Sequence, residues 1–218
     1  GAGPRAVSAA SADRGLAPNG IGTLYGSGFA PDGLRIAVVD TAGIERAGTV
    51  FYAGASQVNF LVPDGTAVGP ARVRVLRGDG SEAQSTAVQV NAVAPAVFTA
   101  TASGRGVPAA IAVQGGAAVE VFRCSGPLLC VARPLEPRDG RPVYLSLFVT
   151  GLRWYRSGVR VTFAGEDVPV EFAGAQSQFA GLDQVNVRLE RTLRARGEED
   201  LVVIADGVAS NVVRVLVQ

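Results

Sequence analysis

The chain has 218 residues, of which 48% are hydrophobic and 18% are charged, so it can bury a core and is not an intrinsically disordered chain. Its formal net charge is +1 and it contains no histidine. Bulk attraction to nucleic acid or to an anionic membrane is therefore excluded, and the commonest general base and metal ligand is missing. The length suffices for one large domain or two ordinary ones.

The first 13 residues, GAGPRAVSAASAD, are small and weakly patterned. They predict an N-terminal arm or linker over residues 1–13. Such an arm could lend a strand to the open sheet edge of a neighbouring molecule. Because the sequence begins with Gly1 rather than Met, we expect a processed or excised piece.

Beyond the arm, apolar and polar residues alternate with a period of two, as in ARVRVLR at 71–77, VRVTF at 159–163 and SNVVRVLVQ at 210–218. This pattern is typical of strands with one buried and one wet face. Tight turns between strands are indicated by five Asp-Gly pairs, at 32–33, 64–65, 79–80, 139–140 and 206–207. The best helical candidate, RTLRARGEED at 191–200, is short and contains Gly197.

Six segments recur in the same order, with an offset of roughly 120 to 128 residues. The pairs are TLYGSGF at 23–29 with SLFVTGL at 146–152, RIAVV at 35–39 with VRVTF at 159–163, YAGA at 52–55 with FAGA at 172–175, QVN at 57–59 with QVN at 184–186, GPARVRV at 69–75 with GEEDLVV at 197–203, and STAVQVNAV at 85–93 with SNVVRVLV at 210–217. We therefore predict an all-β fold of two tandem immunoglobulin-like β-sandwich domains related by internal duplication.

The repeat sets the expected domain boundaries. The first sandwich is predicted over residues 14–94 and the second over 95–218. At the junction, VAPAVFTA, Pro95 breaks a strand and Phe98 could plug the interface. The second domain carries an extra N-terminal hairpin, AAIAVQGGAAVEVF, which turns at Gly115-Gly116, followed by a cysteine loop.

The two cysteines, Cys124 and Cys130, lie in CSGPLLC. A disulfide closing this loop is favoured and would imply an oxidising compartment; the alternative is a pair of free thiols in an apolar segment. Two thiolates without histidine cannot complete a tetrahedral shell, so we expect no metal.

The repeated phrase places two amides opposite each valine-lined strand face: Gln57 and Asn59 in the first copy, Gln184 and Asn186 in the second. Amides donate and accept hydrogen bonds, so we interpret these residues as a structural brace that holds loop backbone. The functional alternative is a carbohydrate or peptide contact, formed with the nearby aromatic residues Tyr52, Phe172 and Phe179.

A second contact candidate is GLRWYRSG, where Trp154 and Tyr155 stand between Arg153 and Arg156. An exposed aromatic pair between arginines is a possible interface anchor. The alternative is a strand end with one of the two aromatic side chains buried.

No catalytic site is legible. Ser27 and Ser56 have no histidine to activate them, and the glycine-rich YGSGF at 25–29 does not lead into a helix that could cradle phosphate. We expect no catalytic residues, no cofactor and no enzymatic activity.

The chain resembles a known family at several of these motifs: LYGSGFA at 24–30, FYAGASQVNFLVP at 51–63, VAPAVF at 93–98, LFVTGL at 147–152, FAGAQSQFAGLDQVNVRLE at 172–190 and GVASN at 207–211. It is similar to the uncharacterised C-terminal domain found in large secreted proteins of acidobacteria, the Solibacter-type domain. It departs from that pattern at Asp183, where an aromatic is usual, at Glu190, where proline is usual, and in the cysteine loop. The resemblance implies paired immunoglobulin-like units of exported proteins and implies no activity.

We therefore expect a non-enzymatic structural or adhesive module of an exported bacterial protein, at the cell surface or outside the cell. One form of this hypothesis is a self-assembling fibre subunit that polymerises through the N-terminal arm. The alternative is a carbohydrate- or protein-binding module of a secreted protein. No run of about 18 apolar residues is present, so no membrane span is expected.

Overall fold

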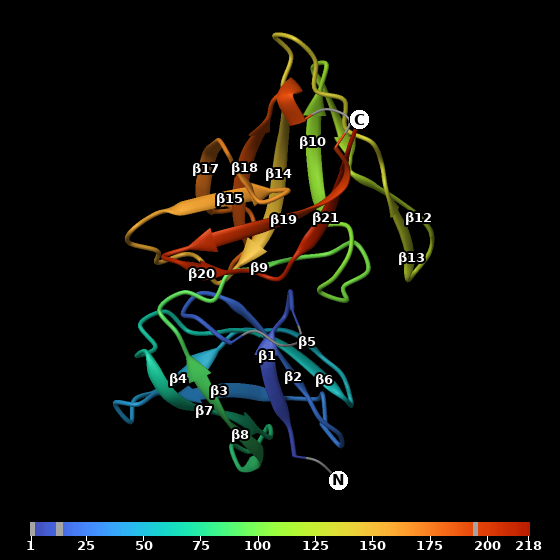
Figure 1. Cartoon of the computed structure of the whole chain (residues 1–218). Helices are drawn as coiled ribbons and strands as arrows, with labels where there is room; N and C mark the ends of the chain where they lie inside the picture. Colours follow the sequence, from blue (N-terminus) through green and yellow to red (C-terminus); the bar gives the residue numbers. More distant parts are fainter. Residues whose placement is uncertain (1–2, 12–14, 194–195) are drawn as a thin grey trace.

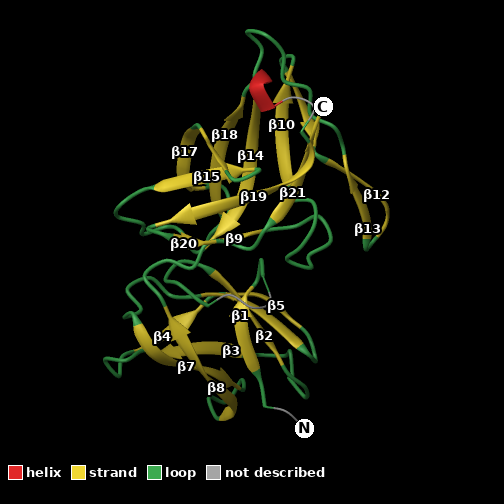
Figure 2. Cartoon of the chain, in the orientation of Figure 1, coloured by secondary structure: helices red, strands yellow, loops and turns green. Residues whose placement is uncertain are grey.

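The fold is all-β, as the sequence predicts. The structure, a computed structural model, describes residues 3–11, 15–193 and 196–218. Apart from one turn of 3-10 helix, Arg191–Leu193, every named element is a strand (Figure 2). The strands form two halves stacked end to end, with the N-terminal half at the bottom of Figure 1 and the C-terminal half at the top.

The first half is a sandwich of two antiparallel four-stranded sheets. Sheet 1a has the order β1 (Arg5–Ser8), β2 (Ile21–Tyr25), β6 (Gln57–Leu61) and β5 (Val50–Ala53). Sheet 1b has the order β4 (Glu45–Gly48), β3 (Arg35–Val39), β7 (Gly69–Leu76) and β8 (Glu82–Val90). Their facing side chains, among them Leu24, Phe60 and Val73, form a core of their own.

The second half repeats this plan with a separate core. Sheet 2a has the order β11 (Ala117–Glu120), β10 (Ala110–Gln114), β14 (Val143–Thr150), β18 (Asp183–Leu189) and β17 (Val170–Ala175), and β9 (Ala96–Val97) also pairs with β14. Sheet 2b has the order β16 (Glu166–Val168), β15 (Val159–Phe163), β19 (Gly197–Ala205) and β20 (Val208–Ala209), and β21 (Val213–Val217) also pairs with β19.

Strand pairing supports the duplication. The run β2–β6–β5 in sheet 1a corresponds to β14–β18–β17 in sheet 2a. Both runs contain the same irregularity: the register shifts between Val50 and Tyr52 in β5, and between Val170 and Phe172 in β17. After the shift, Tyr52 lies opposite Asn59 and Phe172 lies opposite Asn186. A bulge retained at the same place in both copies indicates descent from one unit.

The expected turns are present. Each glycine of the five Asp-Gly pairs has a positive φ, between 62° and 88°, which is the left-handed region that glycine enters without strain. The helical candidate at 191–200 is wrong beyond its first turn: β19 begins at Gly197 and forms an antiparallel ladder with β21. Residues 194 and 195 lie outside the described part of the chain.

The N-terminal segment differs from the expected arm. Arg5–Ser8 forms β1 and pairs with β2 over four residues, from Arg5 opposite Tyr25 to Ser8 opposite Gly22. Val7 is buried, at 5% exposure. This stretch therefore already completes the edge of its own sheet, and residues 1–2 and 12–13 of the predicted arm lie outside the described residues.

The two halves meet at a close backbone contact. Ala94 donates a hydrogen bond to the Gly151 carbonyl at 2.7 Å. Gly151 has a φ of +80°, and a Cβ added there would lie 2.2 Å from the Ala94 carbonyl oxygen. Glycine is thus required at position 151, both by its dihedral angle and by the close approach of the Ala94 backbone.

Two hairpins extend the second half. The predicted one, β10–β11, turns at Gly115-Gly116 with φ values of 61° and 85°, as a two-residue turn requires. The β12 (Phe122–Gly126) and β13 (Leu129–Ala132) hairpin projects from the body in Figure 1 and is closed by the Cys124–Cys130 disulfide, the pairing favoured from the sequence.

Candidate binding site

A groove of about 700 Å³ lies on the outer face of sheet 1a, where parts of the second half approach it. Its floor comes from β2, β5 and β6, and its rim from Phe98 and from residues 179–182. The lining residues are Ala9, Ile21, Thr23, Tyr25, Phe51, Gln57, Asn59, Phe98, Ala102, Phe179, Ala180 and Leu182. None of these described lining residues carries a charge.

Strand alternation explains why these side chains face the groove. Leu24 and Val58 point into the core with no exposed surface, so the residues on either side of them must point outward. In the β2–β6 register, Tyr25 lies opposite Gln57 and Thr23 opposite Asn59. The outward set therefore forms a compact patch of one aromatic ring, two amides and a hydroxyl.

The bulge in β5 adds a second aromatic ring. The register shift between Val50 and Tyr52 leaves Phe51 without a ladder partner, and Phe51 lines the groove. Three aromatic side chains in the groove are well exposed: Tyr25 at 44%, Phe51 at 45% and Phe179 at 63%. Phe98 is half-buried beside them.

The amides form a small network on the groove floor. The Gln57 Nε2 group and the Thr23 hydroxyl both donate to Asn59 Oδ1, each at 2.9 Å. Within the described part of the chain, the Asn59 amide nitrogen and the Gln57 amide oxygen have no protein partner. The floor therefore presents one fixed donor and one fixed acceptor to a ligand.

The second pair of predicted amides behaves alike on sheet 2a. Gln184 Nε2 donates to Asn186 Oδ1 at 2.8 Å. Among the described residues, neither amide pair forms a side-chain hydrogen bond to loop backbone. The interpretation that these amides hold loop backbone is therefore wrong, and each glutamine instead bonds to the asparagine two residues later. The role of holding loop backbone belongs to Asn211, which is buried and binds both backbone groups of Val97 at 2.8 and 3.0 Å, and the Gly104 carbonyl at 2.9 Å.

The four residues Arg153 to Arg156, predicted as one interface, have separate structural roles. Arg153 pairs with the fully buried Asp183 at 2.7 Å and donates to the Leu182 carbonyl. Burial raises the pKa of the Asp183 carboxyl, and the hydrogen bond from Arg153 opposes that rise. The Tyr155 hydroxyl donates to the Ala173 carbonyl and its ring packs on the core, whereas Trp154 is 52% exposed.

Arg156, the last residue of this segment, contributes through its backbone. Its N–H group and that of Ser157 donate to the Asp206 carboxylate, and these bonds lower the pKa of Asp206. The structure thus matches the second interpretation of this stretch, a strand end with one aromatic side chain partly buried, and it places Asp183 in the ion pair that anchors Arg153.

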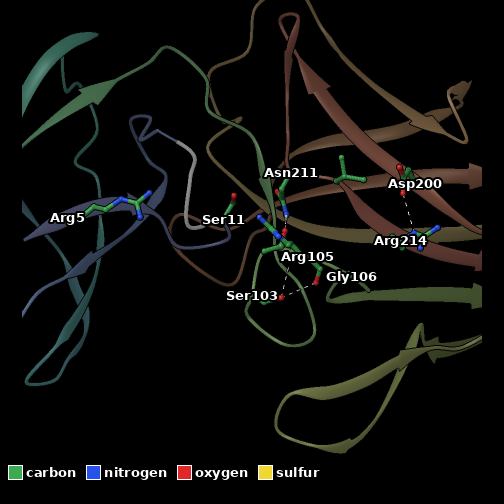
Figure 3. A pocket seen from close by; sticks show the side chains of 10 residues that line it. Arg5, Ser11, Ser103, Arg105, Gly106, Asp200, Asn211 and Arg214 are labelled. Carbon is green, nitrogen blue, oxygen red and sulfur yellow. Dashed lines mark hydrogen bonds and ion pairs between the residues drawn. The ribbon is translucent and has the colours of Figure 1, made fainter.

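A second cavity, of about 670 Å³, lies between the N-terminal strand and the end of the second half (Figure 3). Arg214 pairs with Asp200 at 3.3 Å, and the Ser103 hydroxyl donates to the Arg105 backbone carbonyl. Asn211, described above, holds the loop that carries Gly104. This cavity lies where the N-terminal segment meets the second half. We take the groove on sheet 1a as the candidate site, because it exposes aromatic rings and amide groups to solvent.

The sequence indicates part of the groove. It singles out Gln57, Asn59 and Phe179 for a ligand contact, and the structure brings these three together. It misses Tyr25 and Phe51, although Tyr25 could have been found from the alternation with Leu24. Tyr52 and Phe172 do not line the groove; Phe172 belongs to the other sandwich, on β17 of sheet 2a.

The described residues contain no group of three or more metal-ligating side chains. No helix in the described part of the chain is long and apolar enough to cross a membrane.

No family model matches the sequence, and no curated protein matches it. One solved structure with some similarity is the Bacteroides ovatus protein SGBP-B of a mixed-linkage glucan utilization locus, in complex with a mixed-linkage heptasaccharide. It is 12% identical, with a TM-score of 0.40 and coverage of 94% of this chain and 42% of that chain. The chain thus spans less than half the length of that protein.

Proposed function

We propose that the protein is a non-enzymatic binding module that holds a neutral carbohydrate in the groove on sheet 1a. The observation that carries this proposal is the combination, in one uncharged groove, of three exposed aromatic rings with an amide pair that keeps a free donor and a free acceptor.

A sugar ring fits these groups chemically. Its C–H faces are weakly positive and apolar, and they pack against the negative face of an aromatic ring. Its hydroxyls both donate and accept, which matches the free Asn59 nitrogen and Gln57 oxygen. A uronate or a phosphate would need cationic partners, and the described lining has none. A neutral glycan is therefore the ligand class that the groove favours.

Other features support binding over chemistry or assembly. The chain has no histidine, so the commonest catalytic base is missing. The Cys124–Cys130 disulfide supports an oxidising, exported location, in keeping with the resemblance to secreted bacterial domains. Self-assembly through the N-terminal arm loses its main support, because Arg5–Ser8 is already paired within its own sheet.

The proposal is tested by isothermal titration of the full chain with three neutral hexasaccharides, cellohexaose, xylohexaose and mannohexaose. Binding of at least one is expected, and Phe179→Ala should weaken it tenfold or more. Trp154→Ala is the matched control, because Trp154 is a comparably exposed aromatic outside the groove, and it should leave affinity within twofold. Failure of all three sugars to bind, or equal effects of the two variants, would overturn the proposal.

A further inference from the structure

The outer face of sheet 2a carries nearly the same set of side chains as the outer face of sheet 1a, part of which forms the groove floor. In sheet 1a the outward pairs are Tyr25 opposite Gln57, Thr23 opposite Asn59, and Tyr52 opposite Asn59. In sheet 2a they are Phe148 opposite Gln184, Ser146 opposite Asn186, and Phe172 opposite Asn186. Each position keeps its chemistry in both copies: aromatic, hydroxyl, amide, amide and aromatic.

The glutamine-to-asparagine bond recurs in both sets, whereas the bond from the Thr23 hydroxyl to Asn59 is found in the first set alone among the described residues. The glutamine-to-asparagine bond is 2.9 Å in the first and 2.8 Å in the second. In both, the asparagine nitrogen and the glutamine oxygen are left without a protein partner among the described residues. Phe172 is 44% exposed and its counterpart Tyr52 is 54% exposed, whereas Phe148, the counterpart of Tyr25, is half-buried. The second face thus also presents a donor, an acceptor and an open aromatic ring.

Core packing does not explain this agreement, since these side chains point away from the core. The opposite sheets show what happens without such a constraint. Along β7 and β19 the inward residues stay apolar, with Val73 matched by Leu201, while the outward Arg72 is matched by Asp200. The outward pair Arg72 and Asp200 on sheets 1b and 2b has diverged even in charge, whereas the five outward positions named above on sheets 1a and 2a have kept their residue types.

The second face is broader than the groove. Tyr144, Ile111 and Val113 lie beside it on β14 and β10, each 40–43% exposed, so they extend it as an open platform. Two positions differ: the bulge residue is Phe51 in β5 and Glu171 in β17, and Leu61 in β6 is matched by Arg188 in β18. Glu171 pairs with Arg188 at 3.1 Å, and Arg188 also pairs with Glu190 at 2.7 Å, so charged side chains lie at this end of the face.

We infer that the outer face of sheet 2a is a second binding site for the same class of neutral glycan, so that the chain is bivalent. This inference rests on the proposed function of the groove, because the chemistry of the ligand is taken from there. Two linked sites on one rigid chain retain a polymer more strongly than either site alone, by up to about 10² to 10⁴ where both engage one strand.

Stoichiometry tests the inference. The hexasaccharide that the chain binds best is titrated into the wild type, Phe179→Ala, Phe172→Ala and the double variant, with circular dichroism and thermal melting to confirm folding. We expect two molecules bound per wild-type chain, one per single variant and none per double variant. Retention of the chain by the matching polysaccharide in affinity electrophoresis should fall at least tenfold in each single variant.

The outcomes separate the two proposals. One molecule bound per wild-type chain, lost in Phe179→Ala and unchanged in Phe172→Ala, would overturn the second site and leave the groove. Binding lost only in Phe172→Ala would support the face of sheet 2a and overturn the groove. Absence of binding to all of the hexasaccharides would overturn both.

Discussion

The hydroxyl of Thr150, in the second half, accepts a hydrogen bond from the backbone N–H of Ile21, in the first half, at 2.8 Å. The same hydroxyl donates to the Gly181 carbonyl, also at 2.8 Å. Thr150 is buried, with 1% of its surface exposed. Ile21 belongs to the groove floor and Gly181 lies between two residues of its rim, so one side chain fixes the two walls relative to each other.

Replacing Thr150 by valine tests this joint. The substitution keeps the shape and leaves the Ile21 N–H and the Gly181 carbonyl unsatisfied, which costs about 1–3 kcal/mol per buried group. We expect the free energy of unfolding, measured with urea, to fall by about that amount, and sugar affinity to fall with it. Thr162→Val, on the outer side of β15, should change stability by less than about 0.5 kcal/mol; equal effects would contradict the role of Thr150.

Gly151→Ala probes the backbone contact between the halves. The added methyl would clash with the Ala94 carbonyl and would also occupy a left-handed conformation. Gly207→Ala is the matched control, since Gly207 has the same φ of +80° and open space around its position. We expect about 1 kcal/mol of destabilisation for the control, from the dihedral angle alone, and clearly more at Gly151. Similar thermal melting of the two variants would show that the halves do not press together there.

Acid stability depends on Asp40. Its carboxylate accepts hydrogen bonds from the backbone N–H groups of Ala67, Ile44 and Ala42 and pairs with Arg46. The Ala67 bond and the others lower the pKa of Asp40 from its usual 3.8. Because the folded pKa lies below the unfolded one, the stabilisation is complete above about pH 4 and is lost as the pH falls through the folded value.

Asp40→Asn should therefore destabilise the protein at pH 7 and lose less additional stability between pH 4 and pH 2 than the wild type. Urea midpoints across this range measure both effects. Asp32→Asn, in an exposed loop, serves as the control and should follow the wild-type profile. If Asp40→Asn lost as much stability between pH 4 and pH 2 as the wild type, the proposed role of Asp40 would be contradicted.

The pKa of Asp183 is shifted in the opposite direction to that of Asp40. Burial raises the pKa of its carboxyl in the folded state, so this group favours folding most when protonated, and its contribution declines as the pH rises from 3.8 through the folded pKa. Its partner Arg153 limits that decline. Arg153→Met should leave a buried carboxylate unpaired and destabilise the protein by about 3–5 kcal/mol at pH 7, with partial recovery at pH 4. A stability loss that is the same at both pH values would argue against the buried pair.

Reduction of the disulfide should act locally. The Cys124–Cys130 loop is short, with a sequence separation of 6, so the chain-entropy estimate is about 2 kcal/mol of stability. The β12–β13 hairpin lies outside the groove, and sugar affinity should therefore be unchanged in the Cys124→Ser, Cys130→Ser double variant. Thermal melting and titration on the same sample measure both quantities, and a loss of binding would show that the hairpin contributes to the site.

The fold was predictable because its signals are local. Alternating valines mark each strand, and the Asp-Gly pairs mark turns whose glycines all adopt positive φ values. The six repeated segments then identify the two copies. The N-terminal strand was not predicted, because the segment 5–8 is short and weakly patterned. It forms a strand by pairing with the free edge of β2.

The site was predictable in part for the same reason. Gln57 and Asn59 could be placed on the outer face from alternation alone. Phe179 closes the groove only because the segment before β18 folds across to the first half, and Arg153 finds Asp183 across 30 positions of sequence. The first of these contacts depends on how the two sandwiches pack and the second on how loops pack within the second sandwich, and residue patterns along the chain encode neither.

The most direct measurement is a ¹H–¹⁵N NMR titration that follows the side-chain NH₂ signals of Gln57 and Asn59 as a neutral hexasaccharide is added. The account predicts saturable shifts of both, while the side-chain signal of Gln89, on β8 of the opposite sheet, stays in place. Saturable binding that leaves the Gln57 and Asn59 signals unmoved would contradict it.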